Sequence, residues 1–172
     1  MPRKALIAAS LAVLALLAAA TPALAGTYRA HTAHSATQLR IELTGYSWQD
    51  NTPPGSATVS HPILHNRAGG TGTYSNPITV AVPGANSTMQ FPPGTRFYLA
   101  KIHRYVIVED SGATKYELPH LDLWIDGRTG TRAATNRCMD MLTGATTAIR
   151  NAAPGLPVTT GPIYSNGKCR IN

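Results

Sequence analysis

The chain has 172 residues, with fifteen Lys and Arg against eight Asp and Glu, and a net charge of +7. The basic residues are scattered and form no stripe, so we expect no nucleic-acid partner. A modest positive charge fits adhesion to an anionic wall polymer. After the apolar run near the start of the chain, the sequence contains no other apolar run long enough to span a bilayer.

The first 25 residues predict a secretory signal peptide. Arg3 and Lys4 form a basic start, Ala5–Ala20 is apolar without charge, and Ala23-Leu24-Ala25 fits a cleavage site. An uncleaved anchor helix is the alternative, and the polar sequence after the small-residue site argues against it. Cleavage leaves 147 residues from Gly26 with thirteen basic and eight acidic side chains, a net charge of +5. We expect a secreted, extracellular, monomeric protein of single-domain size with no membrane contact after cleavage.

The mature sequence predicts a mainly β fold, a sandwich or a small barrel. Residues 26–38 are polar and small and predict a flexible lead. From there to residue 132 we expect one β domain, because short apolar runs alternate with Gly, Pro, Asn and Ser. The predicted strands are Leu39–Ser47, Ile78–Val82, Arg96–Tyr98, Tyr105–Glu109 and His120–Asp126.

The last forty residues, 133–172, predict an extension packed on that domain. Ala133–Leu142 has few β-branched residues and ends before Thr143-Gly144, which favours a short helix. Cys138 and Cys169 are the only cysteines, and an even pair in an oxidising compartment is most simply one disulfide. It would close about 30 residues and add roughly 3 kcal/mol in the loop-entropy model. A metal pair or a catalytic thiol is the alternative, but neither has its usual spacing here.

The strand His120–Asp126 presents an unusual polar face. Successive side chains on a strand point to opposite sides, so Leu121, Leu123 and Ile125 share the core face. The other face then carries His120, Asp122, Trp124 and Asp126. An exposed Trp beside carboxylates is a common way to bind sugars. The alternative is an ordinary solvent face whose Trp packs beneath a loop.

Acidic residues gather in the same region. Five of the eight lie within eighteen positions: Glu109, Asp110, Glu117, Asp122 and Asp126. Asp110 ends an apolar strand before a glycine turn, so it either lies at a rim near Asp122 or caps its own turn. Paired carboxylates in unequal surroundings can serve as acid and base.

Several motifs in order carry a resemblance to a known fold. They are Leu43-Thr44-Gly45-Tyr46-Ser47, Ile78-Thr79-Val80-Ala81-Val82, Phe91-Pro92-Pro93-Gly94-Thr95-Arg96-Phe97-Tyr98, Val108-Glu109-Asp110-Ser111-Gly112 and His120-Leu121-Asp122-Leu123-Trp124. From Leu39 to Gly127 the chain resembles the six-stranded double-psi β-barrel of expansins, barwin-like proteins, family-45 endoglucanases and the three-aspartate domain of lytic transglycosylases. The order is closest to the three-aspartate and expansin-like members.

The resemblance implies site residues. Asp122 matches the acid of the His-x-Asp signature, Asp110 matches the Asp-x-Gly acid, and Thr44 and Tyr46 match groove positions of the first strand. The sequence departs from the pattern in three ways. Pro83 stands where the three-aspartate pattern has an acid, Asp50 is displaced from the second endoglucanase acid, and the many cysteines of plant and fungal relatives are absent.

These observations lead to three candidate functions. The first is an expansin-like protein that binds and loosens wall polysaccharide, either peptidoglycan or a β-glucan or chitin, with catalytic Asp122 and Asp110 and with substrate-binding Thr44, Tyr46, His120 and Trp124. The second is a lytic transglycosylase or glycoside hydrolase, for which inverting hydrolysis needs a base roughly 6.5–9.5 Å from the acid. The third is a non-catalytic barwin-like inhibitor or effector. The histidines are dispersed, so we expect no metal and no cofactor.

Overall fold

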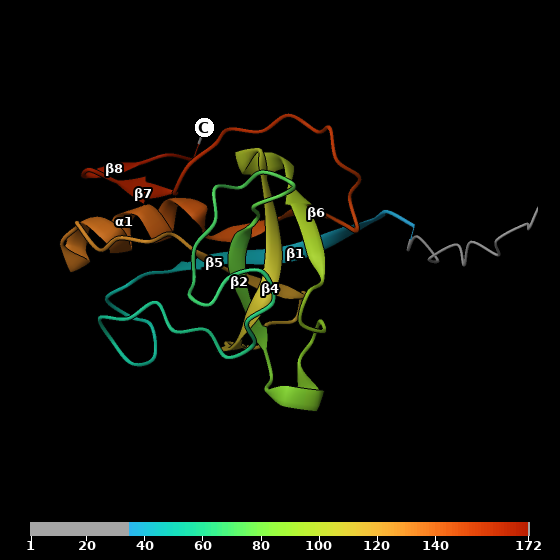
Figure 1. The fold of residues 1–172 in the computed structure, drawn as a ribbon, viewed down its shortest axis with the longest axis horizontal. Helices are drawn as coiled ribbons and strands as arrows, with labels where there is room; N and C mark the ends of the chain where they lie inside the picture. Colours follow the sequence, from blue (N-terminus) through green and yellow to red (C-terminus); the bar gives the residue numbers. More distant parts are fainter. Residues whose placement is uncertain (1–34, 172) are drawn as a thin grey trace, which may run out of the picture. The chain divides into compact units, whose positions relative to one another are not determined.

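The computed structural model describes residues 35–171, which fold around one closed β-barrel (Figure 1). The predicted signal peptide and most of the predicted lead lie outside the described residues. None of the helices among residues 35–171 has the length and apolar character needed to cross a bilayer. The barrel strands are β1 (Thr37–Tyr46), β2 (Ile78–Pro83), β3 (Arg96–Leu99), β4 (Arg104–Ala113), β5 (His120–Trp124) and β6 (Gly144–Arg150).

The strands follow one another around the barrel in the order β1, β5, β2, β4, β3, β6. Two neighbouring pairs are parallel, β1 with β5 and β2 with β4, and the other four pairs are antiparallel. In the β1–β5 pair Thr44 lies opposite Asp122, and on the other side of β5 Asp122 lies opposite Ala81. This register brings an acid and a hydroxyl together at the centre of the sheet.

Apolar strand residues fill the barrel interior. All six residues of β2 are buried, as expected for a strand that lies between two others, and its sequence is almost continuously apolar. Leu43, Val108, Leu121 and Leu123 are fully buried. The five strands that the sequence predicted are therefore confirmed, with ends that differ by a few residues.

The helix α1 (Arg132–Leu142) begins at the Thr131 hydroxyl, which accepts a hydrogen bond from the Ala134 N–H. Its buried face packs on β1 at Gly45, where a β-carbon would lie 3.1–3.2 Å from Met139, Ile125 and Leu142. A larger residue here would require Met139, Ile125 and Leu142 to shift by a few tenths of an ångström, so glycine suits this close approach. Both the predicted helix and the predicted Cys138–Cys169 disulfide are confirmed, and the two Cα atoms lie 5.5 Å apart.

The predicted domain boundary at residue 132 is corrected by β6. This strand pairs with both β1 and β3 and closes the barrel, so residues 144–150 belong to the barrel and not to an extension packed on it. The segment is Gly-Ala-Thr-Thr-Ala-Ile-Arg, which lacks the apolar run that marked the other strands. Ala148 is the one fully buried residue of β6. The alternation of apolar and polar side chains along the strand is therefore too weak to predict it from the sequence.

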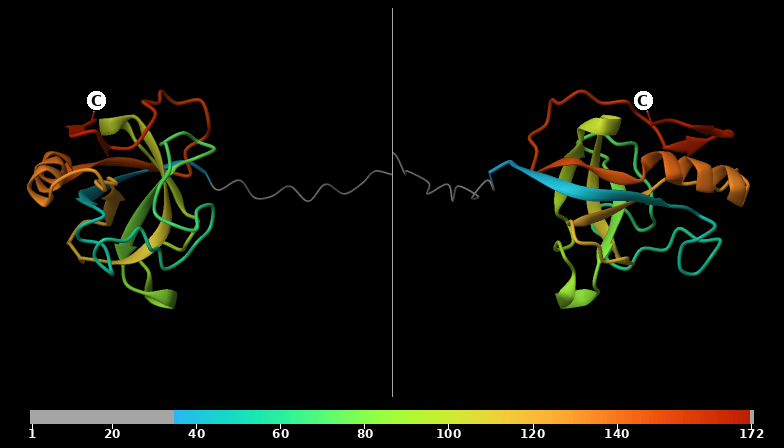
Figure 2. Two further views of the ribbon diagram at one scale, coloured as in Figure 1. Left: turned by 60° about the vertical axis from the view of Figure 1, so that its left-hand side comes forward. Right: turned by 180° about the vertical axis from the view of Figure 1, so that it is seen from behind.

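Residues after β6 run back over the barrel as a tail. The Tyr98 hydroxyl donates to the Pro157 carbonyl at 2.7 Å, and the Tyr105 hydroxyl donates to the Ala153 carbonyl at 2.6 Å. The tail ends in a short hairpin, β7 (Tyr164–Ser165) and β8 (Lys168–Cys169), which lies beside α1 (Figure 2). The remaining short elements are two 3₁₀ turns, Asn86–Thr88 and Ala100–Ile102.

Candidate functional site

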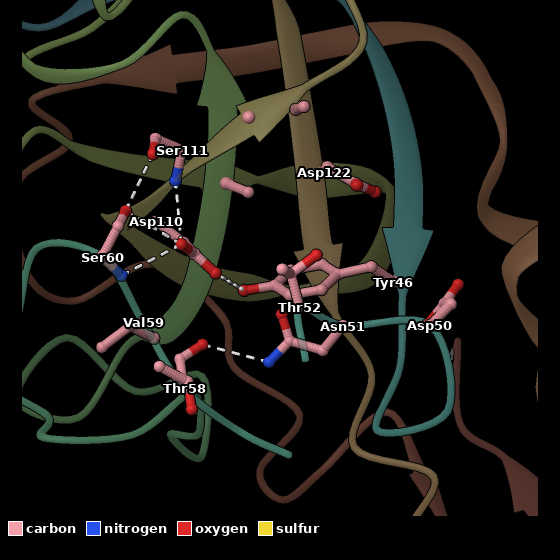
Figure 3. Close-up of a pocket in the computed structure, with 13 residues that line it drawn as sticks. Tyr46, Asp50, Asn51, Thr52, Thr58, Val59, Ser60, Asp110, Ser111 and Asp122 are labelled. Carbon is pink, nitrogen blue, oxygen red and sulfur yellow. Dashed lines mark hydrogen bonds between the residues drawn. The ribbon is translucent and has the colours of Figure 1, made fainter. Parts of the chain in front are cut away.

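A pocket of about 390 Å³ opens beside β5 and collects three carboxylates (Figure 3). Asp122 comes from β5, Asp110 from β4, and Asp50 from the turn after β1. No Lys or Arg lines the pocket. Its walls are completed by Tyr46, Asn51, Thr52, Thr58, Val59, Ser60, Ala81, Ser111, Gly112 and Ala113. The small residues Ala81, Gly112 and Ala113 leave the space open in front of the acids.

Asp122 is the carboxyl whose acidity the fold changes most. The Thr44 hydroxyl lies 2.5 Å from Oδ1, while Oδ2 has no hydrogen-bond partner among residues 35–171. Burial, aided by the charges of Asp50 and Asp110, raises the pKa of Asp122 to about 6, and the Thr44 hydrogen bond opposes this rise. Asp122 therefore holds a proton in weakly acidic water, as a general acid must.

Thr44 joins Asp122 to a buried histidine. Its Oγ1 lies 2.7 Å from Nε2 of His120, and Nδ1 of His120 lies 2.6 Å from the Thr114 carbonyl oxygen. That carbonyl can only accept, so Nδ1 carries a hydrogen. Burial lowers the pKa of His120, which favours the neutral ring with Nε2 as an acceptor. The single Thr44 hydrogen can then serve ionised Asp122 or, when Asp122 is protonated, His120.

Asp110 also lines the pocket, and four hydrogen bonds fix its carboxylate as an acceptor. Its Oδ1 accepts from the Ser60 N–H at 3.1 Å, the Ser60 hydroxyl at 3.0 Å and the Ser111 N–H at 2.9 Å. Its Oδ2 accepts from the Tyr46 hydroxyl at 3.1 Å (Figure 3). Burial and the nearby charges of Asp110 and Asp122 raise the pKa of Tyr46 well above its usual value. Asp110 thus both caps its own turn and lines the pocket.

Asp50 is the exposed acid of the three. Its Oδ1 accepts from the backbone N–H of Ser47 at 2.5 Å and from the Ser47 hydroxyl at 2.7 Å, which fixes the turn that follows β1. In the sequence Asp50 is displaced from the position of the second endoglucanase acid, which left its role open. In the structure it lines the same pocket as Asp122.

Two predicted groove residues are buried. Trp124 is 3% exposed and packs edge-on against Tyr46, with ring centroids 5.2 Å apart. His120 is 1% exposed. The predicted sugar-stacking platform at Trp124 is therefore wrong, because the face that alternation assigned to solvent is covered within the fold. Asp126 lies beyond β5 in an ion pair with Arg128 at 3.0 Å, as a rim acid.

Sequence reasoning missed an exposed aromatic side chain next to His120, outside the residues that line the pocket. Tyr116 is 43% exposed, and its ring packs edge-on against His120 with centroids 4.7 Å apart. It stands in the polar loop between β4 and β5, between Lys115 and Glu117. The available signal in the sequence was a tyrosine in a polar loop, four residues before His120.

The described residues also bear on metal binding. No group of three or more His, Cys, Asp or Glu side chains within residues 35–171 is arranged to hold a metal ion. Asp50, Asp110 and Asp122 share a pocket, but each is committed to hydroxyl or backbone donors. The arrangement suits proton transfer and hydroxyl recognition.

Comparison with known proteins places the chain in a family. An uncharacterized protein of Dictyostelium discoideum is 40% identical over 115 residues, which are 62% of this chain and 47% of that protein. The chain thus matches about half the length of this relative. No solved structure matches the chain. The family model of the DDB_G0273701 N-terminal domain matches residues 38–170, from the start of β1 to the end of the tail hairpin, and the chain belongs to this family.

Proposed function

We propose that this chain is a secreted, expansin-like protein that binds cell-wall polysaccharide and remodels it, with Asp122 as its proton-donating acid. The observation that carries the proposal is the raised pKa of Asp122, about 6, in an open pocket that it shares with two further carboxylates. Titratable groups whose surroundings push their pKa values apart are the usual mark of acid and base assignments.

The fold supports this proposal. A closed six-stranded barrel with the parallel pairs β1–β5 and β2–β4 fits the double-psi architecture that the motif order suggests. The His-x-Asp strand and the Thr44 strand are neighbours in that barrel, as the resemblance requires. The disulfide favours an oxidising compartment, in agreement with the signal peptide expected at residues 1–25.

The pocket suits a neutral glycan. Its lining offers carboxylate and hydroxyl groups from Asp50, Thr58, Ser60 and Ser111, which match sugar hydroxyls, and no cation that would select an anionic ligand. When Asp122 is protonated, its free Oδ2 can donate a hydrogen bond to an oxygen of the bound sugar. We assign the stacking role that Trp124 cannot fill to Tyr116, whose ring is exposed beside His120 and lies outside the residues that line the pocket.

A second candidate is glycan cleavage, by a lytic transglycosylase or a glycoside hydrolase. Cleavage with inversion needs a base across the bond from the acid, and Asp50 and Asp110 both line the pocket of Asp122. Asp50 is the better base of the two, because one of its oxygens is free and its side chain is exposed, whereas Asp110 accepts four hydrogen bonds. A non-catalytic inhibitor or effector is the third outcome, and it requires that no polysaccharide enters the pocket.

One experiment separates these outcomes. Protein exported into the medium of an expression host is incubated with peptidoglycan, cellulose and chitin, and we measure binding by pull-down, soluble reducing ends and anhydro-sugars. The matched variants are Asp122→Asn and Asp126→Asn, since Asp126 lies outside the pocket in its ion pair with Arg128.

The expected result is binding to one polymer and weakening of that polymer in an extension assay without soluble products. Both effects persist in Asp126→Asn, and weakening is lost in Asp122→Asn. Anhydro-sugars that depend on Asp122 would establish lytic cleavage, and new reducing ends would establish hydrolysis. If the wild-type protein binds none of the polymers, the expansin-like proposal is overturned.

A further inference from the structure

Glu109 and Asp110 are consecutive acids on β4, yet they serve different surroundings. The pairing of β2 with β4 skips Glu109: Val80 lies opposite Val108, and the next residue, Ala81, lies opposite Asp110. Glu109 is therefore the extra residue of a β-bulge, a feature that redirects side chains and is common beside active sites. Asp110 lines the pocket, whereas Glu109 is fully buried and absent from the pocket lining.

The Glu109 carboxylate is saturated by four donors. Oε1 accepts from the backbone N–H groups of Leu64 at 2.7 Å and His65 at 2.9 Å. Oε2 accepts from the Thr79 hydroxyl at 2.8 Å and lies 2.7 Å from Nδ1 of His65. Burial alone raises the pKa of Glu109, but the hydrogen bonds from His65, Leu64 and Thr79 outweigh it and hold the pKa below its usual value. Glu109 is thus an ionised, buried anchor.

The His65 ring lies between Glu109 and Asn76. Nδ1 faces the Glu109 carboxylate, and Nε2 lies 2.7 Å from the side-chain oxygen Oδ1 of Asn76. A carboxylate can only accept, so Nδ1 carries a hydrogen and donates it to Glu109. The side chain of His65 is 18% exposed and that of Glu109 is 0% exposed. A hydrogen bond to a buried carboxylate therefore fastens the segment that carries His65.

That segment is also a wall of the pocket. Thr58, Val59 and Ser60 line the pocket, and the chain then crosses β4, where the His61 N–H donates to the Glu109 carbonyl at 2.9 Å. Ser60 gives its N–H and its hydroxyl to Asp110. The same stretch is thus fastened twice, by Ser60 to Asp110 on the pocket side and by Leu64 and His65 to Glu109 on the buried side.

We propose that the His65–Glu109 hydrogen bond is a positioning device for the pocket, which holds residues 58–65 against β4 so that Ser60 stays bonded to Asp110. Neither His65 nor Glu109 touches the ligand. Their effect reaches the pocket through Ser60, which sets where Asp110 points and which of its lone pairs remain for a bound sugar. This inference extends the proposed function of the pocket and rests on it for the identity of the ligand.

The test uses readouts that need no ligand. In His65→Ala the side-chain donor to Glu109 is lost, and amide hydrogen exchange at Ser60 should rise about tenfold or more, because a buried carboxylate left without one of its donors releases the local structure that it held. In His65→Gln the side-chain amide can still donate to Glu109, so exchange at Ser60 should return toward the wild-type rate. Tyr105→Phe, which loses hydrogen bonds to the tail at Ala153 and Leu156, is the control for general destabilisation.

A second readout reports the hydrogen bond between the two side chains. In wild-type protein the nitrogen NMR spectrum of the His65 ring should show a proton held on Nδ1, and in Glu109→Ala this preference for Nδ1 should be lost. A wild-type His65 ring without a proton on Nδ1 would overturn the hydrogen bond. Unchanged Ser60 exchange in His65→Ala, or an equal rise in Tyr105→Phe, would show a structural role only and would overturn the positioning proposal.

Ligand binding is measured last, on the polymer that wild-type protein retains. The affinity should fall about tenfold in His65→Ala and remain near wild-type in His65→Gln and Tyr105→Phe. If wild-type protein retains no polymer, the proposed function fails, while the exchange and ring measurements still decide whether the His65–Glu109 hydrogen bond positions Ser60.

Discussion

Replacing Asp122 by Asn should make the protein more stable at neutral pH. The pKa of Asp122 rises from 3.8 to about 6 on folding, so the folded state binds the proton more tightly than the unfolded state. The stability that this proton confers is complete below about pH 4 and is lost as the pH rises through about 6. At about 1.4 kcal/mol for each pH unit, ionised Asp122 costs the folded state about 3 kcal/mol at pH 7.

The asparagine keeps an oxygen that accepts from Thr44 and removes the charge that burial penalises. Asp122→Asn should therefore raise the free energy of unfolding at pH 7 by about 1–3 kcal/mol, since Asp122 is only partly buried and water screens part of the effect. The gain should shrink to near zero below about pH 4, where both side chains are neutral.

The assay is thermal unfolding followed by circular dichroism from pH 4 to pH 8, where 1 kcal/mol corresponds to roughly 3 °C in Tm for a domain of this size. Asp126→Asn removes the same charge from the exposed ion pair with Arg128 and should change stability by less than about 1 kcal/mol. The pH dependence of Glu109 is common to all three proteins and cancels in the difference. The reasoning is refuted if Asp122→Asn is no more stable than wild type at pH 7, or if its advantage does not depend on pH.

Three further predictions concern the same fold. Thr44→Val removes the hydrogen bond that opposes the rise, so the pKa of Asp122 should climb above about 6, which carbon NMR of the carboxyl measures; an unchanged value would contradict the Thr44–Asp122 contact. Tyr116→Ala should weaken retention on the bound polysaccharide about tenfold without changing Tm, because an exposed ring contributes to stacking and little to the core; equal retention would exclude the stacking role. Reducing the Cys138–Cys169 disulfide should lower the free energy of unfolding by about 3 kcal/mol, measured by urea denaturation with and without reductant, and coincident curves would contradict it.

Strong local signals explain what the sequence predicted correctly. The buried strand that begins at Ile78 is a nearly continuous apolar run with four β-branched residues. The helix is predicted by the Thr143-Gly144 stop that follows it, and the disulfide by a single pair of cysteines. Motif order assigned Thr44, Asp110 and Asp122 to one site, and the structure shows that Thr44 pairs with Asp122 and that both acids line one pocket.

The missed features depend on contacts between distant segments. Trp124 is buried because Tyr46, from another strand, covers its ring, and alternation along one strand cannot reveal that. His65 and Glu109 are 44 residues apart and meet only through the long connection between β1 and β2. A histidine in a polar loop and an acid at the end of an apolar strand give no sign of each other until the chain has folded.

The position of β6 has a consequence for how the protein can be made. Both neighbours of β1 come from far downstream, since Thr44 pairs with Asp122 and Thr37 pairs with Arg150. Until the ribosome has released the chain through residue 150, β1 has two unpaired edges, and such edges invite aggregation. Any shortened form that ends before Gly144 would keep one edge open and should be insoluble. The region therefore folds as an indivisible unit, and the family match over residues 38–170, which spans every barrel strand, has the extent expected of such a unit.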